Sequence, residues 1–343
     1  MKNYSYNRTE DGEPYCPSCD KIYQSDRGYR YHINRKHNGV EPVDDDVEDF
    51  ESNPGDILTE ITSDNELSQD EKFKEIEKAV RNFNNKLTEA SIDKSEANFN
   101  ATSDYIILLG ISDLHYGNKN VNMDYVDELL EFVADNDNVF CFLSGDLIDN
   151  WVKLAPSGGI YEQTLPPEYQ REVMNRKLAP IKDKILAIVS GNHEQRSERQ
   201  GDENPSKMMA KELDCTYLGF GGRINIKFND GPEYKVHVRH KYKFNSTYNP
   251  THTCVKLIQN KDTEADVVCV GHHHEPAIAS HYVSGKQRSL LRFGSSMAST
   301  GFSESIGFAK TPLEAPSVLL KGDRKVHHPF LDLELAKTYT NNS

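Results

Sequence analysis

Seven side chains that commonly bind metals stand in short clusters between residues 113 and 274. Carboxylate, amide and imidazole groups together form a ligand set that divalent transition metals accept. Seven ligands are enough for two metal ions if one carboxylate bridges them, and Asp146 is the natural bridge. Two ions about 3.5–4 Å apart can hold a phosphate and activate solvent for in-line attack. The pattern therefore predicts a dinuclear centre acting on phosphoesters, with the ligands Asp113, His115, Asp146, Asn192, His240, His272 and His274.

The run GHHH at residues 271–274 supplies two of these ligands from one short segment. In an extended chain successive side chains point to opposite faces, so His272 and His274 share one side and His273 takes the other. A histidine triplet alone would equally suit a solvated loop. Its place directly after an apolar run, which the other clusters share, favours the metal site.

The elements that must position these residues are buried strands. Four continuous apolar runs, YIILLGISDLH, VFCFLSGDLID, ILAIVSGNHE and VVCVGHHHE, each end in one of the clusters. Continuous apolar runs are typical of central strands in a layered α/β domain, whose carboxyl ends form the ligand-binding crevice. The segments 122–135, 167–178 and 203–213 have helical character, and GRINIKFNDGPEYKVHVRHKY reads as a hairpin that ends at His240. Glycines 145, 191 and 271 allow the strands to turn sharply toward the metals.

The ordered blocks DLH, GDLID, GNHE, a lone histidine and GHHH resemble the calcineurin-like metallophosphoesterase family over about residues 104–300. That family has the pattern DxH, GDxxD, GNH(D/E), H and GHxH. The resemblance implies a four-layer αββα sandwich of the α/β class with two divalent metal ions. We expect manganese in this centre, with iron, zinc or nickel as alternatives, because all four accept such mixed ligands.

The resemblance also implies a role for each residue of the blocks. His193 would protonate the leaving oxygen or stabilise the charged phosphoryl group, and Asp149 would orient its neighbours. The lone histidine is assigned to His240 because that residue ends the alternating run, with His237 and His252 as alternatives. One metal would take Asp113, His115 and His274, the other would take Asn192, His240 and His272, and Asp146 would lie between them.

A separate metal site is expected near the N-terminus. Two cysteines and two histidines in the order Cys-x2-Cys-x12-His-x4-His suit tetrahedral zinc, and Tyr23 and Tyr29 occupy the two core positions of a ββα finger. The segment resembles a C2H2 zinc finger over its whole length. The zinc ligands would be Cys16, Cys19, His32 and His37.

The expected finger does not have the side chains of a sequence-specific DNA reader. The base-reading helix positions fall on Ser25, Gly28 and Tyr31, none of which forms a good bidentate contact with a base. We therefore expect sequence-tolerant contacts with nucleic-acid phosphates, and a protein-binding or structural finger is the alternative. The phosphate contacts would come from Lys21, Arg27, Arg30, Arg35 and Lys36.

Charge divides the 343-residue chain, whose formal net charge of −14 disfavours nonspecific coating of nucleic acid. Residues 16–40 carry five Lys/Arg against two Asp, whereas residues 41–60 carry nine Asp/Glu and no basic residue. The longest apolar runs are too short to span a membrane, the N-terminus has no apolar leader, and the cysteines suit a reducing compartment, so we expect a cytoplasmic protein without a membrane partner. The expected parts are a zinc finger (1–40), an acidic linker (41–66), an amphipathic helix with a connector (67–100) and a catalytic domain (101–343).

Together these features favour a metal-dependent phosphodiesterase or nuclease that the finger brings to DNA or RNA. In chemistry, GDLID and GNHE are similar to the blocks of DNA-repair exonucleases. A phosphomonoesterase acting on phosphoproteins or nucleotides would use the same metals. The alternative of another class is a silent nucleic-acid-binding or scaffold protein, which the complete ligand set disfavours.

Overall fold

The computed structural model divides the chain into an N-terminal unit, Met1–Ser91, and a C-terminal unit, Ile92–Ser343, and each is described by itself. No helix among the residues described is both long and apolar enough to cross a membrane. The structure describes residues 15–16, 21–22, 61–62, 68–90, 95–152, 161–283, 285–297 and 312–341.

The N-terminal unit contains a short hairpin and a long helix. Strands β1 (Tyr15–Cys16) and β2 (Lys21–Ile22) pair antiparallel, with Cys16 opposite Lys21. The helix α3 (Gln69–Ala90) starts with a reciprocal cap, in which Ser68 N donates to Glu71 Oε2 at 2.9 Å and Glu71 N donates to Ser68 Oγ at 3.4 Å. The rest of the expected finger, with Cys19, His32, His37, Arg27, Arg30, Arg35 and Lys36, and most of the acidic linker lie outside the described residues.

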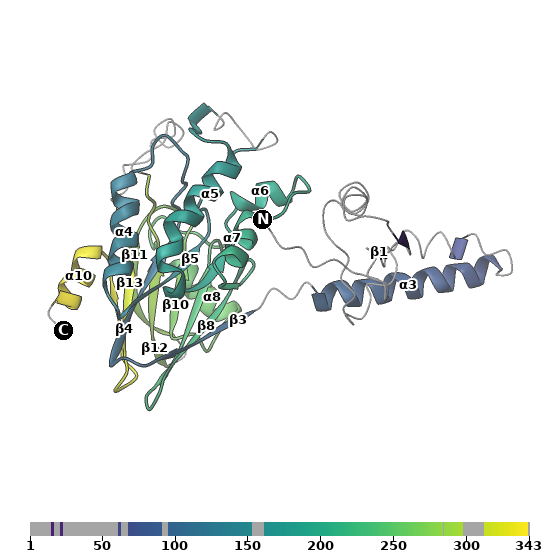
Figure 1. Ribbon diagram of the computed structural model, residues 1–343. Helices are drawn as coiled ribbons and strands as arrows, with labels where there is room; N and C mark the ends of the chain where they lie inside the picture. The colour runs from purple at the N-terminus through teal and green to yellow at the C-terminus, as the bar shows by residue number, and fades with distance from the viewer. Residues whose placement is uncertain are drawn as a thin grey trace. The chain divides into compact units, whose positions relative to one another are not determined.

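The C-terminal unit is built on two six-stranded mixed sheets (Figure 1). In the first sheet, β4 to β7 run parallel, and β13 joins β4 antiparallel. In the second sheet, β10 lies parallel to both β9 and β12. The first sheet has the order β14 (His327–Phe330), β13 (Ser317–Lys321), β4 (Tyr105–Ile111), β5 (Val139–Ser144), β6 (Ile185–Val189) and β7 (Thr216–Tyr217). The second has the order β11 (Ala277–Val283), β12 (Lys286–Arg292), β10 (Val267–Val270), β9 (Glu233–Arg239), β8 (Gly221–Phe228) and β3 (Glu96–Ala101).

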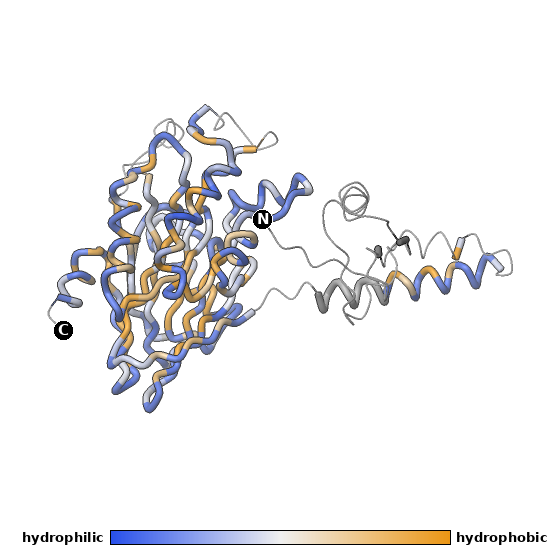
Figure 2. Tube along the Cα trace, in the orientation of Figure 1, coloured by the Kyte–Doolittle hydropathy of each residue, from blue (hydrophilic) through white to orange (hydrophobic). Residues whose placement is uncertain are grey.

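Three apolar cores separate the layers. Ile106 and Leu108 of β4 face Val236 and Val238 of β9 in the core between the sheets. The alternate residues of β4, such as Leu109, pack under the helices that cover the first sheet, and α8 (His252–Asn260) covers the second. Figure 2 shows apolar residues along the inner strands and hydrophilic residues on the outer turns of the helices. The covering helices of the first sheet are α4 (Met123–Asp135), α5 (Pro167–Leu178), α7 (Pro205–Glu212) and α10 (Leu333–Asn341).

The expected sandwich and its elements agree with the structure. The four apolar runs are β4, β5, β6 and β10, and the helical segments are α4, α5 and α7. The structure differs from the expected single crevice at the edge of one sheet. Strands β10 and β9 belong to the second sheet, so the candidate ligands come from both sheets. Residues 96–100, placed in the connector by sequence, are part of β3, which pairs in parallel with β8. The described cysteines 141, 215, 254 and 269 are free thiols.

Candidate metal centre

The candidate ligands meet where strands of the two sheets end. The loops after β4 and β5 are joined by backbone hydrogen bonds, from Asp113 N to Gly145 O at 3.0 Å and from His115 N to Asp146 O at 2.9 Å. The loop after β10 is tied to the first of these, because His272 N donates to Asp113 Oδ2 at 3.0 Å. Three loops that are distant in sequence are thereby held together by backbone N–H groups, with the Asp113 carboxylate as one of the acceptors.

Asp113, His115 and His274 form the first group of possible ligands, with their ligand atoms within 4.8 Å of one another. His274 Nε2 lies 3.2 Å from Asp113 Oδ1 and 3.0 Å from His115 Nε2. Two imidazole nitrogens that face each other need a shared proton or a cation between them, because two lone pairs repel. This group fits a metal ion, and the sequence had assigned the same three residues to one site.

Asp146, His240 and His272 form the second group, and a further set, His115, Asp146 and His193, overlaps the first group at His115 and the second at Asp146. His240 Nδ1 lies 2.7 Å from the carbonyl oxygen of Ser144, to which it can only donate. In the neutral ring the lone pair is therefore on Nε2, which lies 3.2 Å from Asp146 Oδ2 and 3.2 Å from the amide oxygen of Asn192. This arrangement also fits a metal ion, and it brings His240 into the centre rather than the alternatives His237 and His252.

The charge of the centre favours a cation. Asp113 and Asp146 are 0% and 1% exposed, and a buried carboxylate needs a positive partner. Burial by itself lowers the pKa of His240, but the carboxylates of Asp146 and Asp113 outweigh it and raise that pKa to about 10. Burial lowers the pKa of His272 to about 3, so this ring is neutral and able to offer a lone pair.

The backbone of the centre is strained. Eight non-glycine residues among those described have a positive φ, and five of them are candidate ligands. Such conformations cost about 1–3 kcal/mol each and persist where the surrounding structure imposes them, which is common at functional sites. A Cβ on Gly191 would lie 2.1 Å from Asp146 Oδ1, so the loop after β6 approaches the ligand too closely for a side chain. The five ligands are Asp113, His115, Asp146, His272 and His274.

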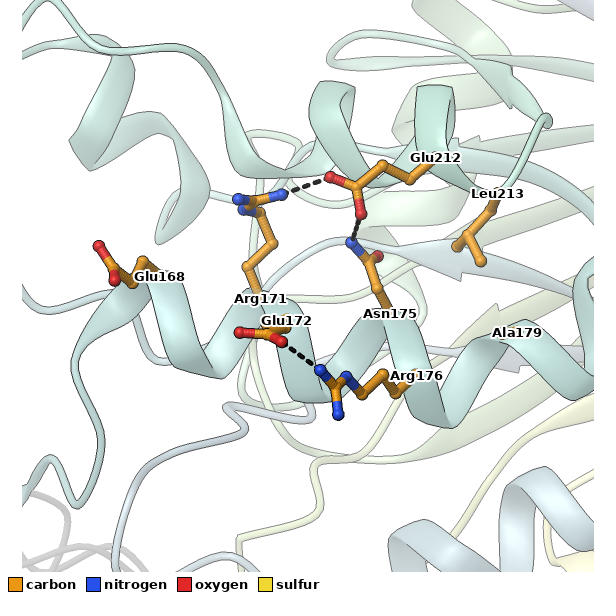
Figure 3. Close-up of a pocket in the computed structure, with 8 residues that line it drawn as sticks. All are labelled: Glu168, Arg171, Glu172, Asn175, Arg176, Ala179, Glu212 and Leu213. Atoms are coloured by element: carbon orange, nitrogen blue, oxygen red, sulfur yellow. Dashed lines mark hydrogen bonds and ion pairs between the residues drawn. The ribbon is translucent and has the colours of Figure 1, made fainter. Parts of the chain in front are cut away.

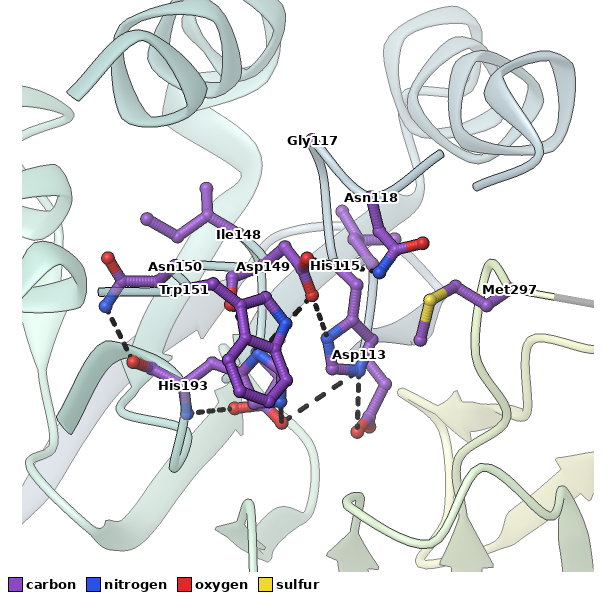
Figure 4. Close-up of polar contacts among 12 residues, drawn as sticks. Asp113, His115, Gly117, Asn118, Ile148, Asp149, Asn150, Trp151, His193 and Met297 are labelled. Carbon is purple, nitrogen blue, oxygen red and sulfur yellow. Dashed lines mark hydrogen bonds and ion pairs between the residues drawn. The ribbon is translucent and has the colours of Figure 1, made fainter. Parts of the chain in front are cut away.

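His193 and Asp149 lie close to His115 of the first group, as Figure 4 shows. His193 Nδ1 is 2.6 Å from the carbonyl oxygen of Asp149, and its Nε2 is 3.8 Å from Asp146 Oδ2. Burial lowers the pKa of His193 to about 4, and Arg196 Nη2 lies 2.8 Å from its Nε2. The ring is therefore a neutral acceptor in this state, and its role as a general acid stays a prediction.

Asp149 lies against both His193 and His115 and accepts a hydrogen bond from Asn118 Nδ2 at 3.1 Å. Its Oδ1 is 3.6 Å from His193 Nδ1 and 3.8 Å from His115 Nδ1. Burial raises the pKa of Asp149 to about 7. The expected role of Asp149 in orienting its neighbours stays a prediction.

Sequence reasoning did not assign a role to Glu194, the last letter of GNHE. Its carboxylate is fully buried and accepts four backbone N–H groups: Asp146 N at 2.9 Å, Leu147 N at 2.7 Å, Ile148 N at 3.3 Å and Gly191 N at 3.0 Å. Burial, followed by the charge of Asp146, raises the pKa of Glu194 to about 7. Glu194 thus fixes the loop that carries Asp146. The available signal was its place next to two assigned residues of the GNHE block.

A surface hollow of about 520 Å³ between α5 and α7 contains none of the predicted site residues (Figure 3). Its charged side chains bind one another, since Glu212 accepts from Arg171 Nη1 at 2.5 Å and from Asn175, and Glu172 accepts from Arg176. The charged side chains of the hollow are bound to one another rather than directed at a common ligand position. We therefore place the candidate active site at the strand ends.

Residues 107–293 match the calcineurin-like phosphoesterase family, and this segment is more than half of the chain. The chain belongs to that family. The match includes both groups of possible ligands and does not include the N-terminal unit. This calcineurin-like phosphoesterase is thereby a metal-dependent hydrolase whose His/Asp clusters are in place.

The solved structures that match this chain are distant in sequence. Calcineurin-like phosphoesterase YfkN from Bacillus subtilis is 12% identical, with a TM-score of 0.33, and the alignment covers 69% of this chain and 97% of that one. A metallophosphoesterase from Sphaerobacter thermophilus is 16% identical, with a TM-score of 0.30 and coverage of 69% and 93%. A putative 5'-nucleotidase from Staphylococcus aureus is 11% identical, with a TM-score of 0.40 and coverage of 69% and 58%. No curated protein matches this sequence.

Proposed function

We propose that this phosphoesterase hydrolyses phosphodiester bonds in DNA or RNA at a dinuclear centre. The observation that carries the proposal is the position of Asp146 Oδ2, which lies 3.2 Å from His240 Nε2 and 4.0 Å from His115 Nε2. One carboxylate oxygen is therefore shared by the two groups of possible ligands. The proposed sites are Asp113, His115, Asp146 and His274 for one ion, and Asp146, Asn192, His240 and His272 for the other.

Divalent ions held there, manganese first and iron, zinc or nickel otherwise, would supply Lewis acidity and activated solvent. The chain itself supplies orientation. Glu194 holds the Asp146 loop through four N–H groups. Asp146 Oδ1 accepts the backbone N–H of His193 at 2.8 Å, which fixes that ring beside the centre. His193 would exchange a proton with a leaving oxygen through Nε2, the atom that lies 2.8 Å from Arg196 Nη2.

Arg196 adds a positive charge at the same edge of the centre. Its Nη1 donates to the carbonyl oxygen of Asp149 at 3.0 Å, and its guanidinium carbon lies 4.1 Å from the centroid of the Trp151 ring. A guanidinium in this position can bind a phosphate oxygen of either a diester or a monoester. A phosphomonoesterase acting on phosphoproteins or nucleotides is therefore the second candidate.

Hydrolysis of two chromogenic esters separates these candidates. With manganese added, we expect bis-p-nitrophenyl phosphate to be cleaved with a higher kcat/KM than p-nitrophenyl phosphate. The Asp146→Asn variant is the control for metal-dependent chemistry. Preference for the monoester would favour the second candidate, and no hydrolysis of either ester with any of the four metals would leave only the silent scaffold.

The proposed DNA or RNA partner needs a second measurement. We propose that the zinc finger delivers the enzyme to nucleic acid through its basic residues. Cleavage of single-stranded and duplex DNA by the full chain is compared with cleavage by a Cys16→Ser, Cys19→Ser double variant. We expect a higher KM for both DNAs in the variant, with unchanged kcat/KM for bis-p-nitrophenyl phosphate. Equal KM values would indicate that the finger binds a protein partner or has a purely structural role.

A further inference from the structure

The segment around and after His240 is basic. Residues 239–261 contain five Lys/Arg and no Asp/Glu, in a chain with a net charge of −14. Lys241 and Lys243 are exposed and stand one and three residues after His240. We call residues 241–250, which connect β9 to α8, the 241–250 loop.

Aromatic rings alternate with these lysines. Tyr242 packs against the apolar cluster under α8, and the Phe244 ring lies 6.2 Å from it between centroids. Phe244 is 41% exposed, and Tyr248 is fully exposed at 102%. Lys243 Nζ lies 4.8 Å from the centroid of the Phe244 ring. The loop thus presents two aromatic faces and two ammonium groups to solvent from a base anchored in the core.

The loop is held in place by a buried arginine. Arg292 of β12 is 2% exposed, and its Nη1 donates to Asn245 Oδ1 at 3.0 Å and to the carbonyl oxygen of Pro250 at 2.9 Å. Phe244 has a φ of 74°, a conformation that is costly for a bulky side chain. An exposed ring gains little from packing, so packing does not explain why Phe244 adopts this costly conformation. We look for the reason in a ligand that the exposed ring could contact.

The loop adjoins the metal centre. Lys241 follows His240 directly in the chain, and His240 Nε2 lies 3.2 Å from Asp146 Oδ2. A chain that bound along the loop would therefore have its phosphates within reach of the centre.

We propose that the 241–250 loop binds single-stranded nucleic acid, with Phe244 and Tyr248 stacking on bases and Lys241 and Lys243 neutralising phosphates. The proposal rests on the phosphodiesterase function above and names its substrate class. Aromatic rings interleaved with basic residues bind single strands, because every base has a face that can stack. In a duplex the base faces are covered by their neighbours, so the loop selects single strands. The loop carries positive charge and no negative charge, so a polyanion matches it better than an apolar peptide without acidic residues does.

Binding is tested without catalysis, by fluorescence anisotropy of the full chain in an Asp146→Asn background that blocks hydrolysis, with no chelator to remove the zinc of the finger. The probes are a fluorescein-labelled twelve-nucleotide oligothymidylate and an abasic oligomer of the same length. We expect Phe244→Ala, Tyr248→Ala to weaken oligothymidylate binding by about tenfold or more, because each stacked base contributes substantially, and to change abasic binding much less. The control Tyr282→Ala removes another exposed tyrosine, on β11, and should leave both affinities within about twofold.

The lysines have a different signature. For Lys241→Gln, Lys243→Gln we expect both probes to bind more weakly, and the slope of log affinity against log salt to fall by about 1.4, since each single-strand phosphate contact contributes about 0.7. Thermal unfolding within a few degrees of the original protein shows that each variant is folded. The finger is the same in all variants, so differences between them report the loop.

Two outcomes overturn the proposal. One is an aromatic double variant that binds oligothymidylate as tightly as the original protein, and the other is an original protein that binds neither probe. Hydrolysis of bis-p-nitrophenyl phosphate is scored separately. A protein that cleaves this small diester but does not bind the oligomers retains the phosphodiesterase function and loses the loop site.

Discussion

Two histidines three residues apart, His237 and His240, belong to clusters of opposite character. His237 Nδ1 lies 2.9 Å from Asp262 Oδ2, and the same carboxylate accepts from Arg223 Nε at 3.1 Å and Nη2 at 2.7 Å. One anion there faces an arginine and a histidine, so its charge is balanced within the protein. Around His240, by contrast, the two buried carboxylates of Asp113 and Asp146 face one imidazole whose pKa they raise to about 10, and a single protonated ring cannot balance both charges. A cluster of Asp and His therefore indicates a metal centre only when the cationic side chains of the cluster do not balance the negative charge of its carboxylates.

The largest expected effect comes from exchanging the two histidines for alanine. His240→Ala removes a ligand beside the bridging carboxylate, and loss of several kcal/mol of transition-state stabilisation corresponds to a fall of about 10³-fold or more in kcat/KM. His237→Ala should change kcat/KM by less than about fivefold. Hydrolysis of bis-p-nitrophenyl phosphate with manganese measures both. Equal losses in the two variants would contradict the contrast between the clusters.

The next effect concerns Glu194, which supports the centre without lining it. Glu194→Gln places an amide N–H group against backbone N–H donors, so the Asp146 loop loses part of its support. We expect kcat/KM to fall by about 10–100-fold, as is typical of residues that orient metal ligands, together with weaker manganese activation. Glu198→Gln on the exposed side of the same helix, α6 (Glu194–Glu198), is the matched control. A Glu194→Gln enzyme with an unchanged manganese titration would show that the support is dispensable.

A smaller effect, on stability rather than activity, is expected at the balanced cluster. Asp262→Asn leaves the guanidinium of Arg223 and the ring of His237 without their carboxylate. The loss of charge-assisted hydrogen bonds predicts a decrease of about 2 kcal/mol in the free energy of unfolding. Urea denaturation at neutral pH measures it, and kcat/KM should stay within about twofold. A stability equal to that of the original protein would mean that solvent replaces the carboxylate.

The smallest effect is the pH dependence of the difference in the free energy of unfolding between the original protein and Asp262→Asn. Burial raises the pKa of Asp262, but the hydrogen bonds from His237 and Arg223 outweigh burial and hold this pKa well below its usual 3.8. A carboxyl whose pKa is lower in the folded state stabilises the fold above its ordinary pKa and loses that contribution as the pH falls toward the folded value. The stability gap between the original protein and Asp262→Asn should therefore be constant above about pH 5 and shrink below about pH 4. A gap that widens on acidification would reverse the sign.

Much of this architecture is visible in the sequence because its signals are local. The run YIILLGI is apolar on both faces of β4, and Asp113 and His115 follow directly, so strand and ligands are read together. Glu194 could not be assigned in this way. Its partners Asp146, Leu147 and Ile148 are 46 to 48 residues earlier in the chain, and nothing in the local pattern shows that their N–H groups need an acceptor.

The choice between His237 and His240 also depended on tertiary structure. His237 lies within β9 beside Arg223 and near Asp262, a residue that follows α8. His240 lies one residue beyond the end of β9, where the chain leaves the sheet. Alternation along the strand predicts which face a residue takes, but a residue after the last strand position is placed by the loops around it. The assignment of β9 and β10 to the second sheet is hidden from sequence for the same reason, since strand pairing is long-range.

Strand β3 has a practical consequence for trimming the protein. Among the described strands it pairs only with β8, through Glu96 to Ala101, and it is the first described element of the C-terminal unit. A fragment that starts at Ser95 keeps this strand, whereas one that starts at Ala101 strips it away and bares the hydrogen-bonding groups of β8. Such an uncovered edge is a template for self-association. The shorter fragment should therefore precipitate where the longer one stays dissolved.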